Sequence, residues 1–285
     1  MSMPIFERAA DLRAYLAPSR IASRRIALVP TMGNLHAGHH SLVELAREHA
    51  DIVVASVFVN PTQFGPNEDF ARYPRTPDED ARGLDASGCD ALFMPGVDEM
   101  YPFGAANTVR VDVPGFDDIL EGALRPGHFS GVATVVAKLF NLVGPDVAVF
   151  GRKDYQQLLV IRRMTRDLAY PIEIVGAPTL REANGLAMSS RNQYLSAEER
   201  ERAGLIRRTL LGMRDESRAG GVDLSKIESR AMALLREAGF TPDYAAIRRA
   251  DDLAIPDPRD RGDLIGLIAA RLGAARLIDN LSFDE

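Results

Sequence analysis

Short apolar runs alternate along the first part of the chain with longer segments whose apolar residues recur every three or four positions. The runs at residues 26–29 and 51–59 are apolar on both faces, which is typical of buried strands in a parallel sheet. Between them lies a set of residues with the i, i+3, i+4, i+7 spacing of one buried helix face: Leu42, Leu45, Ala46 and His49. The pattern predicts a first strand, a helix and a second strand.

This alternation continues to about residue 177. Another helix is predicted to start at Thr76, with Pro77 in the first helical position and Glu79 in the third. The order of strand, helix, strand, helix predicts an α/β fold with a doubly wound parallel sheet and helices on both faces. The remaining elements expected in this part are strands at 91–94, 147–150 and 172–175 and helices at 129–143 and 158–168.

After residue 177 the regular alternation of predicted strands and helices ends. A long helical segment is expected at 196–218, opened by a capping box of Ser196 and Glu199. This part predicts a smaller α+β domain with an antiparallel sheet. We therefore expect two domains, residues 1–177 and 178–285, with no flexible linker between them. The other expected elements are a helix at 224–238 and strands at 244–247, 264–270 and 275–281.

The composition excludes several classes of protein. With 46% hydrophobic and 26% charged residues the chain is typical of soluble globular proteins, and no apolar run reaches the ~18 residues of a membrane span. Residues 1–10 lack the apolar centre of a signal peptide. The net charge of −6 argues against general nucleic-acid binding. Cys89 is the single cysteine, which rules out an internal disulfide, fits a reducing cytoplasm and predicts a packed residue rather than a nucleophile.

The turn after the first strand reads His36-x-Gly38-His39 and leads into a helix. A helix N-terminus offers unpaired N–H groups and a partial positive charge, which suit a phosphate, and Gly38 lets a flat ring or a phosphate approach the backbone. We expect a nucleoside triphosphate here, with His36 and His39 donating hydrogen bonds to it. Two alternatives are ordinary histidines at a helix start, and a zinc site formed by His36, His39 and His40.

Three polar turns follow three of the expected strands, at residues 30–39, 60–65 and 151–157. Because ligands of open parallel sheets bind beyond the carboxyl ends of the strands, these turns are expected to meet in one site. In the second turn, Gln63 can donate to a carboxylate and accept from a hydroxyl or an amine. This edge of the sheet is therefore the expected site.

The third of these turns combines a glycine with charged residues. Gly151 permits a tight turn, and Lys153 could bridge phosphate oxygens. Asp154 could cap the helix or hold Mg²⁺ or a ribose hydroxyl. Gln157, one turn into the helix, could bind a small polar substrate. The alternative is a plain capped helix with a solvated Arg152–Lys153 pair.

Two further loops carry polar residues. At 185–192, two serines beside Arg191 could wrap a triphosphate, and the arginine would offset charge that develops on pyrophosphate. The alternative for this loop is a surface turn before the next helix. The loop at 121–129 is either a mobile cover whose Arg125 or His128 reaches the site, or an ordinary connection to a capped helix.

Five motifs, spread over nearly the whole chain, together resemble the pantothenate synthetase (pantoate–β-alanine ligase) family in their order and spacing. His-x-Gly-His alone marks the wider superfamily of nucleotidylyltransferases and class I aminoacyl-tRNA synthetases, whereas the longer blocks are specific to the ligase. The motifs are Pro-Thr-Met-Gly-Asn-Leu-His-Ala-Gly-His at 30–39, Asn-Pro-Thr-Gln-Phe at 60–64, Tyr-Pro-Arg-Thr at 73–76, Phe-Gly-x-Lys-Asp-Tyr-Gln-Gln at 150–157 and Met-Ser-Ser-Arg-Asn at 188–192.

The resemblance implies a Rossmann-like domain that binds ATP and pantoate, with a C-terminal lid domain. It implies that pantoate, β-alanine and ATP give pantothenate, AMP and pyrophosphate through an enzyme-bound pantoyl adenylate. It also implies Mg²⁺ with the ATP, small-molecule partners, no nucleic acid, no membrane and a homodimer. The carboxylate that meets Mg²⁺ is not identified.

The resemblance also implies roles for individual residues. His39 is the expected proton donor, and His36, Lys153 and Arg191 are expected to act with it in catalysis. Gln63 and Gln157 are expected to bind pantoate, Gln63 also lying near β-alanine. The expected ATP contacts are Met32, Gly33, Asn34, Leu35, His36, Ala37, Gly38, His39, Gly151, Arg152, Lys153, Asp154, Leu180 (through its backbone, to adenine), Met188, Ser189, Ser190 and Arg191.

One residue departs from the family pattern, and two other functions remain as alternatives. Arg152 stands where the family often has Glu or Gln, and its side chain is expected to face solvent. A nucleotidylyltransferase acting on another small acceptor would need a basic acceptor pocket, whereas Gln63 and Gln157 suit a small hydroxy acid. A nucleotide-binding regulatory module without catalysis is disfavoured because the histidine, lysine, serine and arginine positions are all intact.

Overall fold

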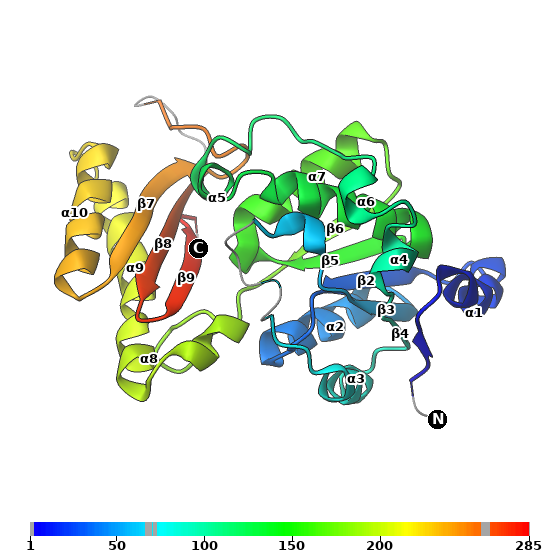
Figure 1. The fold of residues 1–285 in the computed structure, drawn as a ribbon. Coiled ribbons are helices and arrows are strands. Elements are labelled where there is room, and N and C mark those ends of the chain that lie inside the picture. The colour runs from blue at the N-terminus through cyan, green and yellow to red at the C-terminus, as the bar shows by residue number, and fades with distance from the viewer. Residues whose placement is uncertain (1–2, 66–69, 71–72, 258–262, 285) are drawn as a thin grey trace. The chain divides into compact units, whose positions relative to one another are not determined.

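The computed structural model describes residues 3–65, 70, 73–257 and 263–284 (Figure 1). The chain divides into two compact units. Unit 1 comprises Met1–Arg152 and Gln156–Pro178, and unit 2 comprises Lys153–Tyr155 and Thr179–Glu285. In the part of the chain that the structure describes, every helix is too short or too polar to cross a membrane.

Unit 1 is built on a six-stranded sheet in which every pair of neighbouring strands is parallel. The strand order is β1-β4-β3-β2-β5-β6, so β2, the strand before the histidine motif, has β3 and β5 as its neighbours. The predicted doubly wound parallel sheet is therefore confirmed. The strands are β1 (Ile5–Phe6), β2 (Ile26–Thr31), β3 (Ile52–Val57), β4 (Ala91–Phe93), β5 (Val147–Gly151) and β6 (Glu173–Ala177).

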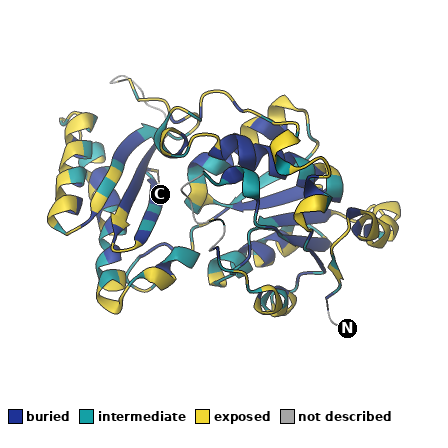
Figure 2. Cartoon of the chain, viewed as in Figure 1, coloured by how far each residue is buried: buried dark blue, intermediate teal, exposed yellow. Residues whose placement is uncertain are grey.

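The helices of unit 1 cover both faces of this sheet, with α2 and α3 on one side and α6 and α7 on the other (Figure 1). Alternate residues of β2, Ala27 and Val29, pack with Leu42 and Val43 of α2 and Leu84 of α3 in one buried cluster. The central strands β2, β3, β4 and β5 are mostly dark in Figure 2, and the outer helix faces are exposed. The helices are α1 (Ala9–Ile21), α2 (Ala37–His49), α3 (Pro77–Ala86), α4 (Val97–Met100), α5 (Leu120–Leu124), α6 (His128–Val143) and α7 (Tyr155–Asp167), with single 3₁₀ turns η1 (Pro61–Gln63), η3 (Ala105–Asn107) and η4 (Arg152–Asp154).

The sequence pattern missed the first two elements of unit 1. It took residues 26–29 as the first strand, but β1 and α1 precede them. β1 is only two residues long, which is too short for a strand pattern to be recognised in the sequence. The expectation drawn from residues 1–10 falls partly on Met1 and Ser2, which lie outside the described residues.

Unit 2 consists of a three-stranded antiparallel sheet, in the order β7-β8-β9, with α9 and α10 packed on it. The expected antiparallel sheet is thus confirmed, and β9 forms one of its edges. The elements are η5 (Ser190–Tyr194), α8 (Ala197–Ala203), α9 (Leu205–Ala219), α10 (Leu224–Glu237), β7 (Thr241–Arg249), β8 (Leu264–Leu272) and β9 (Ala275–Ser282).

The single helical segment expected at residues 196–218 is wrong in one respect, because it is divided at Gly204 into α8 and α9. A side chain at Gly204 would place its Cβ 2.5 Å from the carbonyl oxygen of Asn184, so the close approach of another segment accompanies the break. The capping box of Ser196 and Glu199 at the start of α8 is confirmed.

Cys89 is packed in the core of unit 1, as its sequence context predicts. Its thiol is 5% exposed and donates to the carbonyl oxygens of Val53 and Ala91. Burial raises the pKa of this thiol to about 11, so the reactive thiolate is scarce at neutral pH.

Candidate functional site

The two motif histidines form a reciprocal cap at the start of α2. His36 is the N-cap residue: its Nδ1 accepts from the backbone N–H of Gly38 at 3.1 Å. Nδ1 of His39 accepts from the backbone N–H of His36 at 3.3 Å, and the two ring centroids are 4.1 Å apart. Because Nδ1 is the acceptor in both rings, each neutral imidazole carries its proton on Nε2. The expectation that these Nε2 groups donate to a nucleoside triphosphate stays a prediction.

The loop before this cap is held by the carboxylate of Asp80, which the sequence analysis did not single out. Asp80 is 3% exposed, and its two oxygens accept from the backbone N–H groups of Asn34 at 3.0 Å and Leu35 at 2.8 Å. The hydroxyl of Thr76, the N-cap of α3, donates to the same carboxylate. Gly33 has a φ of +85°, and a Cβ there would lie 2.9 Å from Oδ2 of Asp80. The loop conformation therefore depends on both residues.

A signal for Asp80 was present in the sequence. Asp80 and Leu84 are four residues apart, so they lie on the same face of α3, and Leu84 is fully buried. A carboxylate on the apolar face of a helix needs hydrogen-bond donors from another segment. The sequence could identify such a carboxylate but not the loop that satisfies it.

His40 does not share the environment of the other two histidines. Its Nδ1 lies 2.9 Å from the hydroxyl of Ser87, and its ring packs against Gly83 of α3. Among the described residues, no group of three His, Cys, Asp or Glu side chains could hold a metal ion. The geometry therefore gives no support to the alternative of a zinc site.

The turn after β3 meets the histidine loop through Gln63. This side chain is 7% exposed, and its Nε2 donates to the thioether sulfur of Met32 at 3.1 Å. Asn60, also buried, donates to Oε1 of Gln63 and caps η1 by accepting from the N–H of Thr62. A thioether is a weak acceptor, so a carboxylate or hydroxyl could replace it at little cost. Two of the three expected turns are thus in contact.

His128 holds the backbone of this turn. Its Nδ1 donates to the carbonyl oxygen of Gln63 at 2.8 Å, and its Nε2 accepts from Arg125 at 3.0 Å. His128 is the first residue of α6, and a Cβ on Gly131, one turn later, would lie 2.3 Å from the carbonyl oxygen of Thr62. The loop at 121–129 contains α5 and leads into α6, which favours an ordinary connection, although His128 does support a site residue.

The third turn follows β5, next to β2 in the sheet. Gly151 is the last residue of β5 and is followed directly by η4; it has no positive φ, so this turn does not require the conformational freedom of glycine. A Cβ there would meet no heavy atom within 4 Å, which leaves room for a ligand. Arg152 is exposed and donates to the carbonyl oxygen of Gly176. The Lys153 side chain is only 17% exposed, so the alternative of a solvated Arg152–Lys153 pair is wrong for Lys153.

Two successive glutamines at the start of α7 have different environments. Gln156 is buried and bridges the backbone of Glu121 and Phe116. Gln157 is half-buried, and within the described part of the chain its side chain has no hydrogen bond. Of the two glutamines, Gln157, the residue singled out from the sequence, is therefore the one whose amide could bind a ligand.

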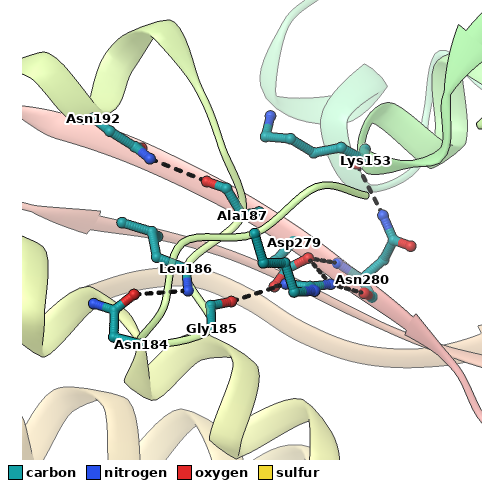
Figure 3. A network of polar contacts seen from close by, with 9 residues as sticks. Lys153, Asn184, Gly185, Leu186, Ala187, Asn192, Asp279 and Asn280 are labelled. Atoms are coloured by element: carbon teal, nitrogen blue, oxygen red, sulfur yellow. Dashed lines mark hydrogen bonds and ion pairs between the residues drawn. The ribbon is translucent and has the colours of Figure 1, made fainter. Parts of the chain in front are cut away.

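In unit 2, Lys153 and Asp154 lie side by side, with Nζ and Oδ2 3.8 Å apart. The carbonyl oxygen of Lys153 accepts from Nδ2 of Asn280 at 2.8 Å, and the lysine side chain extends away from that contact (Figure 3). The sequence analysis did not find Asn280, because nothing local relates it to a turn 127 residues earlier.

The serine–arginine motif follows a short hairpin in unit 2. Arg181 and Ala187 form an antiparallel bridge, and the carbonyl oxygen of Leu180 accepts from the N–H of Met188 at 2.9 Å. Ser189 then caps η5 by accepting from the N–H of Arg191 at 3.2 Å. The motif, Ser189–Arg191, therefore directly follows a defined hairpin and is not a plain surface turn.

Glu182 ties this hairpin to α8 and η5. Its carboxylate accepts from Arg200 at 2.6 Å and 2.9 Å and from Asn192 at 2.8 Å. Burial by itself would raise the pKa of Glu182, but the hydrogen bonds from Arg200 and Asn192 outweigh it and bring the pKa below its ordinary value. Glu182 is therefore an anion that supports the hairpin.

Comparison with known proteins decides the family. The model of the family described as pantoate-beta-alanine ligase matches residues 4–282. This chain belongs to the pantoate–β-alanine ligase family. A pantothenate synthetase from Xanthomonas axonopodis pv. citri is 61% identical over 272 residues, which cover 95% of this chain and 96% of that protein.

Solved structures of members of this family also match this chain. A pantothenate synthetase from Thermus thermophilus matches with a TM-score of 0.90 and 50% identity, covering 99% of both chains. A pantoate–β-alanine ligase from Francisella tularensis, complexed with β-γ ATP and β-alanine, matches with a TM-score of 0.79 and 32% identity over 100% of this chain and 99% of that one. The predicted family, fold class and ligase activity are confirmed, and the alternatives of another nucleotidylyltransferase or a non-catalytic module fall away.

Proposed function

We propose that this ligase condenses pantoate with β-alanine in two steps. In the first, a carboxylate oxygen of pantoate forms a bond to the α-phosphorus of ATP, and the bond to pyrophosphate breaks. In the second, the amine of β-alanine attacks the activated carbonyl and AMP leaves with that carboxylate oxygen. Family membership supports this reaction. The observation that supports the roles below is the reciprocal cap at the start of α2, in which Nδ1 of His36 and of His39 accepts, so that a neutral ring of either residue is protonated on Nε2.

ATP is proposed to lie on the histidine loop, the turn after β5 and the segments of unit 2 that carry phosphate-binding side chains. Phosphoryl-type transfer is catalysed mainly by positioning and charge neutralisation, which fixed donors and cations supply. His39 is the proposed donor to the reacting phosphate, and His36, Lys153 and Arg191 are proposed to act with it in catalysis. The ATP contacts are proposed to be Met32, Gly33, Asn34, Leu35, His36, Ala37, Gly38, His39, Gly151, Arg152, Lys153, Asp154, Leu180, Met188, Ser189, Ser190 and Arg191.

Pantoate is proposed to bind through two side-chain amides, Gln63 and Gln157. An amide offers both donors and an acceptor, which suits a molecule that carries a carboxylate and hydroxyls. The weak thioether partner of Gln63 and the half-buried, unbonded amide of Gln157 support this choice. Gln63 is also proposed to lie near β-alanine.

The second step needs a neutral amine and an adenylate that is shielded from water. We propose that residues 1–177 bind ATP and pantoate and that residues 178–285 act as the lid. The assignment of Lys153 and of the serine–arginine motif to unit 2 supports a catalytic role for that unit.

Magnesium is proposed to enter with the nucleotide. Mg²⁺ is commonly held by substrate phosphates, water and one or two carboxylates rather than by a cage of protein ligands. The described residues fit this arrangement, because they contain no three-ligand cluster and Asp154 offers a half-exposed carboxylate beside Lys153. When bound, the ion would neutralise phosphate charge.

The oligomeric state and the location of the enzyme are also proposals. Family resemblance supports a homodimer, and light scattering on the purified protein would measure its mass. The single cysteine, Cys89, is consistent with the cytoplasm, where thiols stay reduced.

An isotope experiment tests the two-step reaction. Pantoate labelled with ¹⁸O in its carboxylate is incubated with the enzyme, ATP, Mg²⁺ and β-alanine, and the products are analysed by mass spectrometry. We expect one ¹⁸O atom in AMP for each pantothenate formed. Label that remains wholly in pantothenate and water, or that enters inorganic phosphate, would contradict an acyl adenylate.

A further inference from the structure

The edge strand β9 contacts the turn that carries Lys153. Asn280 is 8% exposed and donates from Nδ2 to the carbonyl oxygen of Lys153 at 2.8 Å. A carbonyl oxygen accepts only, which fixes the orientation of the amide of Asn280. The contact holds the main chain of Lys153 and leaves its ammonium group directed elsewhere (Figure 3).

The preceding residue of β9 holds the other segment. Asp279 is 4% exposed, and its two oxygens accept from Arg181 at 2.7 Å and 3.0 Å in a bidentate pair. Arg181, which lies in the first strand of the hairpin, also donates to the carbonyl oxygen of Gly185 at its tip, at 3.1 Å. That hairpin ends at Met188, directly before the serine–arginine motif.

The two contacts are mechanically linked, because their anchors are adjacent residues. The backbone N–H of Asn280 donates to Oδ1 of Asp279 at 2.8 Å, which couples one anchor to the other. β9 is itself fixed by pairing with β8 along its whole length, with Asp279 opposite Ile268. Planar bidentate pairs restrict direction as well as distance. The strand can therefore set the spacing between the two segments that it holds.

We propose that Asp279 and Asn280 form a positioning pair that holds Lys153 and the serine–arginine motif in register for the phosphates of ATP. The inference rests on the proposed function, because it assumes that Lys153 and Arg191 bind phosphates. Neither Asp279 nor Asn280 touches the substrate. They act through the residues whose backbones and hairpin they fix.

Asn280→Asp tests the first half of the pair, since it keeps the shape but turns a carboxylate toward the carbonyl oxygen of Lys153. We expect the adenylation rate to fall roughly ten- to a hundredfold, with a smaller rise in the KM for ATP. If this variant fails to fold, Asn280→Ala removes the donor without adding a charge and is judged by the same criterion. Thermal unfolding of each variant reports its folding.

A double-mutant cycle distinguishes positioning from general stability. If Asn280 acts through Lys153, Asn280→Asp should change the rate of a Lys153→Ala enzyme by no more than about twofold. An equal loss in both backgrounds would overturn the positioning role while leaving the role of Lys153 intact. An unchanged rate for Lys153→Ala alone would overturn the phosphate role of Lys153 and, with it, this inference.

Asp279→Asn tests the second half, and the same sheet supplies its control. Asp243 on β7 accepts from Arg276 on β9 at 2.7 Å, so Asp243→Asn removes another arginine–aspartate pair of the same sheet, one that is more exposed than the Arg181–Asp279 pair. We expect Asp279→Asn to weaken ATP binding roughly tenfold. This effect should be lost in an Arg191→Ala background. Asp243→Asn should leave ATP binding unchanged. Equal losses of ATP affinity in the two variants would mean that Asp279 only stabilises the sheet and does not position the serine–arginine motif.

Discussion

The histidine loop of unit 1 and the segments of unit 2 that are proposed to bind phosphates are held over very different distances along the chain. In unit 1, His36 and His39 cap each other across three residues, and Asp80 reaches the loop from about 45 residues away. In unit 2, β9 holds segments 98 and 127 residues distant. The histidine cap is visible in the sequence as a motif, whereas the contacts of Asp80 and of β9 exist only in the folded chain.

This difference predicts that a substitution in the histidine loop can lower the reaction rate without lowering the stability of the fold. His39→Ala should lower the adenylation rate by roughly 10² to 10³, because it removes a donor that acts on charge developing in the transition state. ATP affinity should change far less. Single-turnover kinetics and calorimetric ATP binding measure the two quantities.

His39→Gln is the matched control, since glutamine at this position can restore the cap by accepting from the N–H of the N-cap residue. We expect near-wild-type stability with the same large loss of rate. Equal losses in rate and ATP affinity in His39→Ala would mean that the residue is only structural, and recovery of activity in His39→Gln would mean that an amide donor can replace the imidazole.

Asp80→Asn should damage both stability and rate, because an amide cannot accept two backbone N–H groups on two oxygens. We expect unfolding to require about 2 kcal/mol less free energy, with roughly tenfold slower adenylation. Urea unfolding and single-turnover assays measure these effects. A wild-type unfolding midpoint would show that Asp80 does not hold the loop.

Gln63→Ala should act on one substrate only. Loss of the amide should raise the KM for pantoate about tenfold, corresponding to about 1.4 kcal/mol, and leave the KM for ATP nearly unchanged. Steady-state kinetics with each substrate varied in turn provides the internal control. A change confined to ATP would assign this turn to the nucleotide instead.

The smallest effect is expected at Glu182, and it depends on pH. Because the folded-state pKa of Glu182 lies below its ordinary value, its ionised form stabilises the fold above the unfolded-state pKa, and this contribution is lost as pH falls through the folded-state pKa. Glu182→Gln should therefore lower the unfolding temperature most at pH 7 and progressively less below about pH 4.5. A difference in unfolding temperature between the two proteins that grows toward acid pH would contradict the stabilising role of ionised Glu182.

The alternation of strand and helix patterns was enough to predict the parallel sheet of unit 1 and the antiparallel sheet of unit 2. Where local pattern was weak, prediction failed: the two-residue β1 was missed, and the break at Gly204 depends on the backbone of Asn184. Propensity and periodicity describe neighbours in sequence, and these features depend on neighbours in space.

The same limit applies to the candidate site. The helix start at His36 and the selection of Gln157 as a candidate follow from local spacing. The supporting residues Asp80, His128 and Asn280 do not, because each acts on the backbone of a distant segment through one hydrogen-bonding group. A buried polar residue signals that such a partner exists without identifying it.

Pyrophosphate release is the measurement that tests the central claim most directly. Purified enzyme is mixed with ATP, Mg²⁺ and pantoate, with and without β-alanine. A bound pantoyl adenylate predicts one pyrophosphate per active site without the amine and continuous turnover with it. No release under either condition, in a protein that binds ATP, would contradict the acyl-adenylate mechanism.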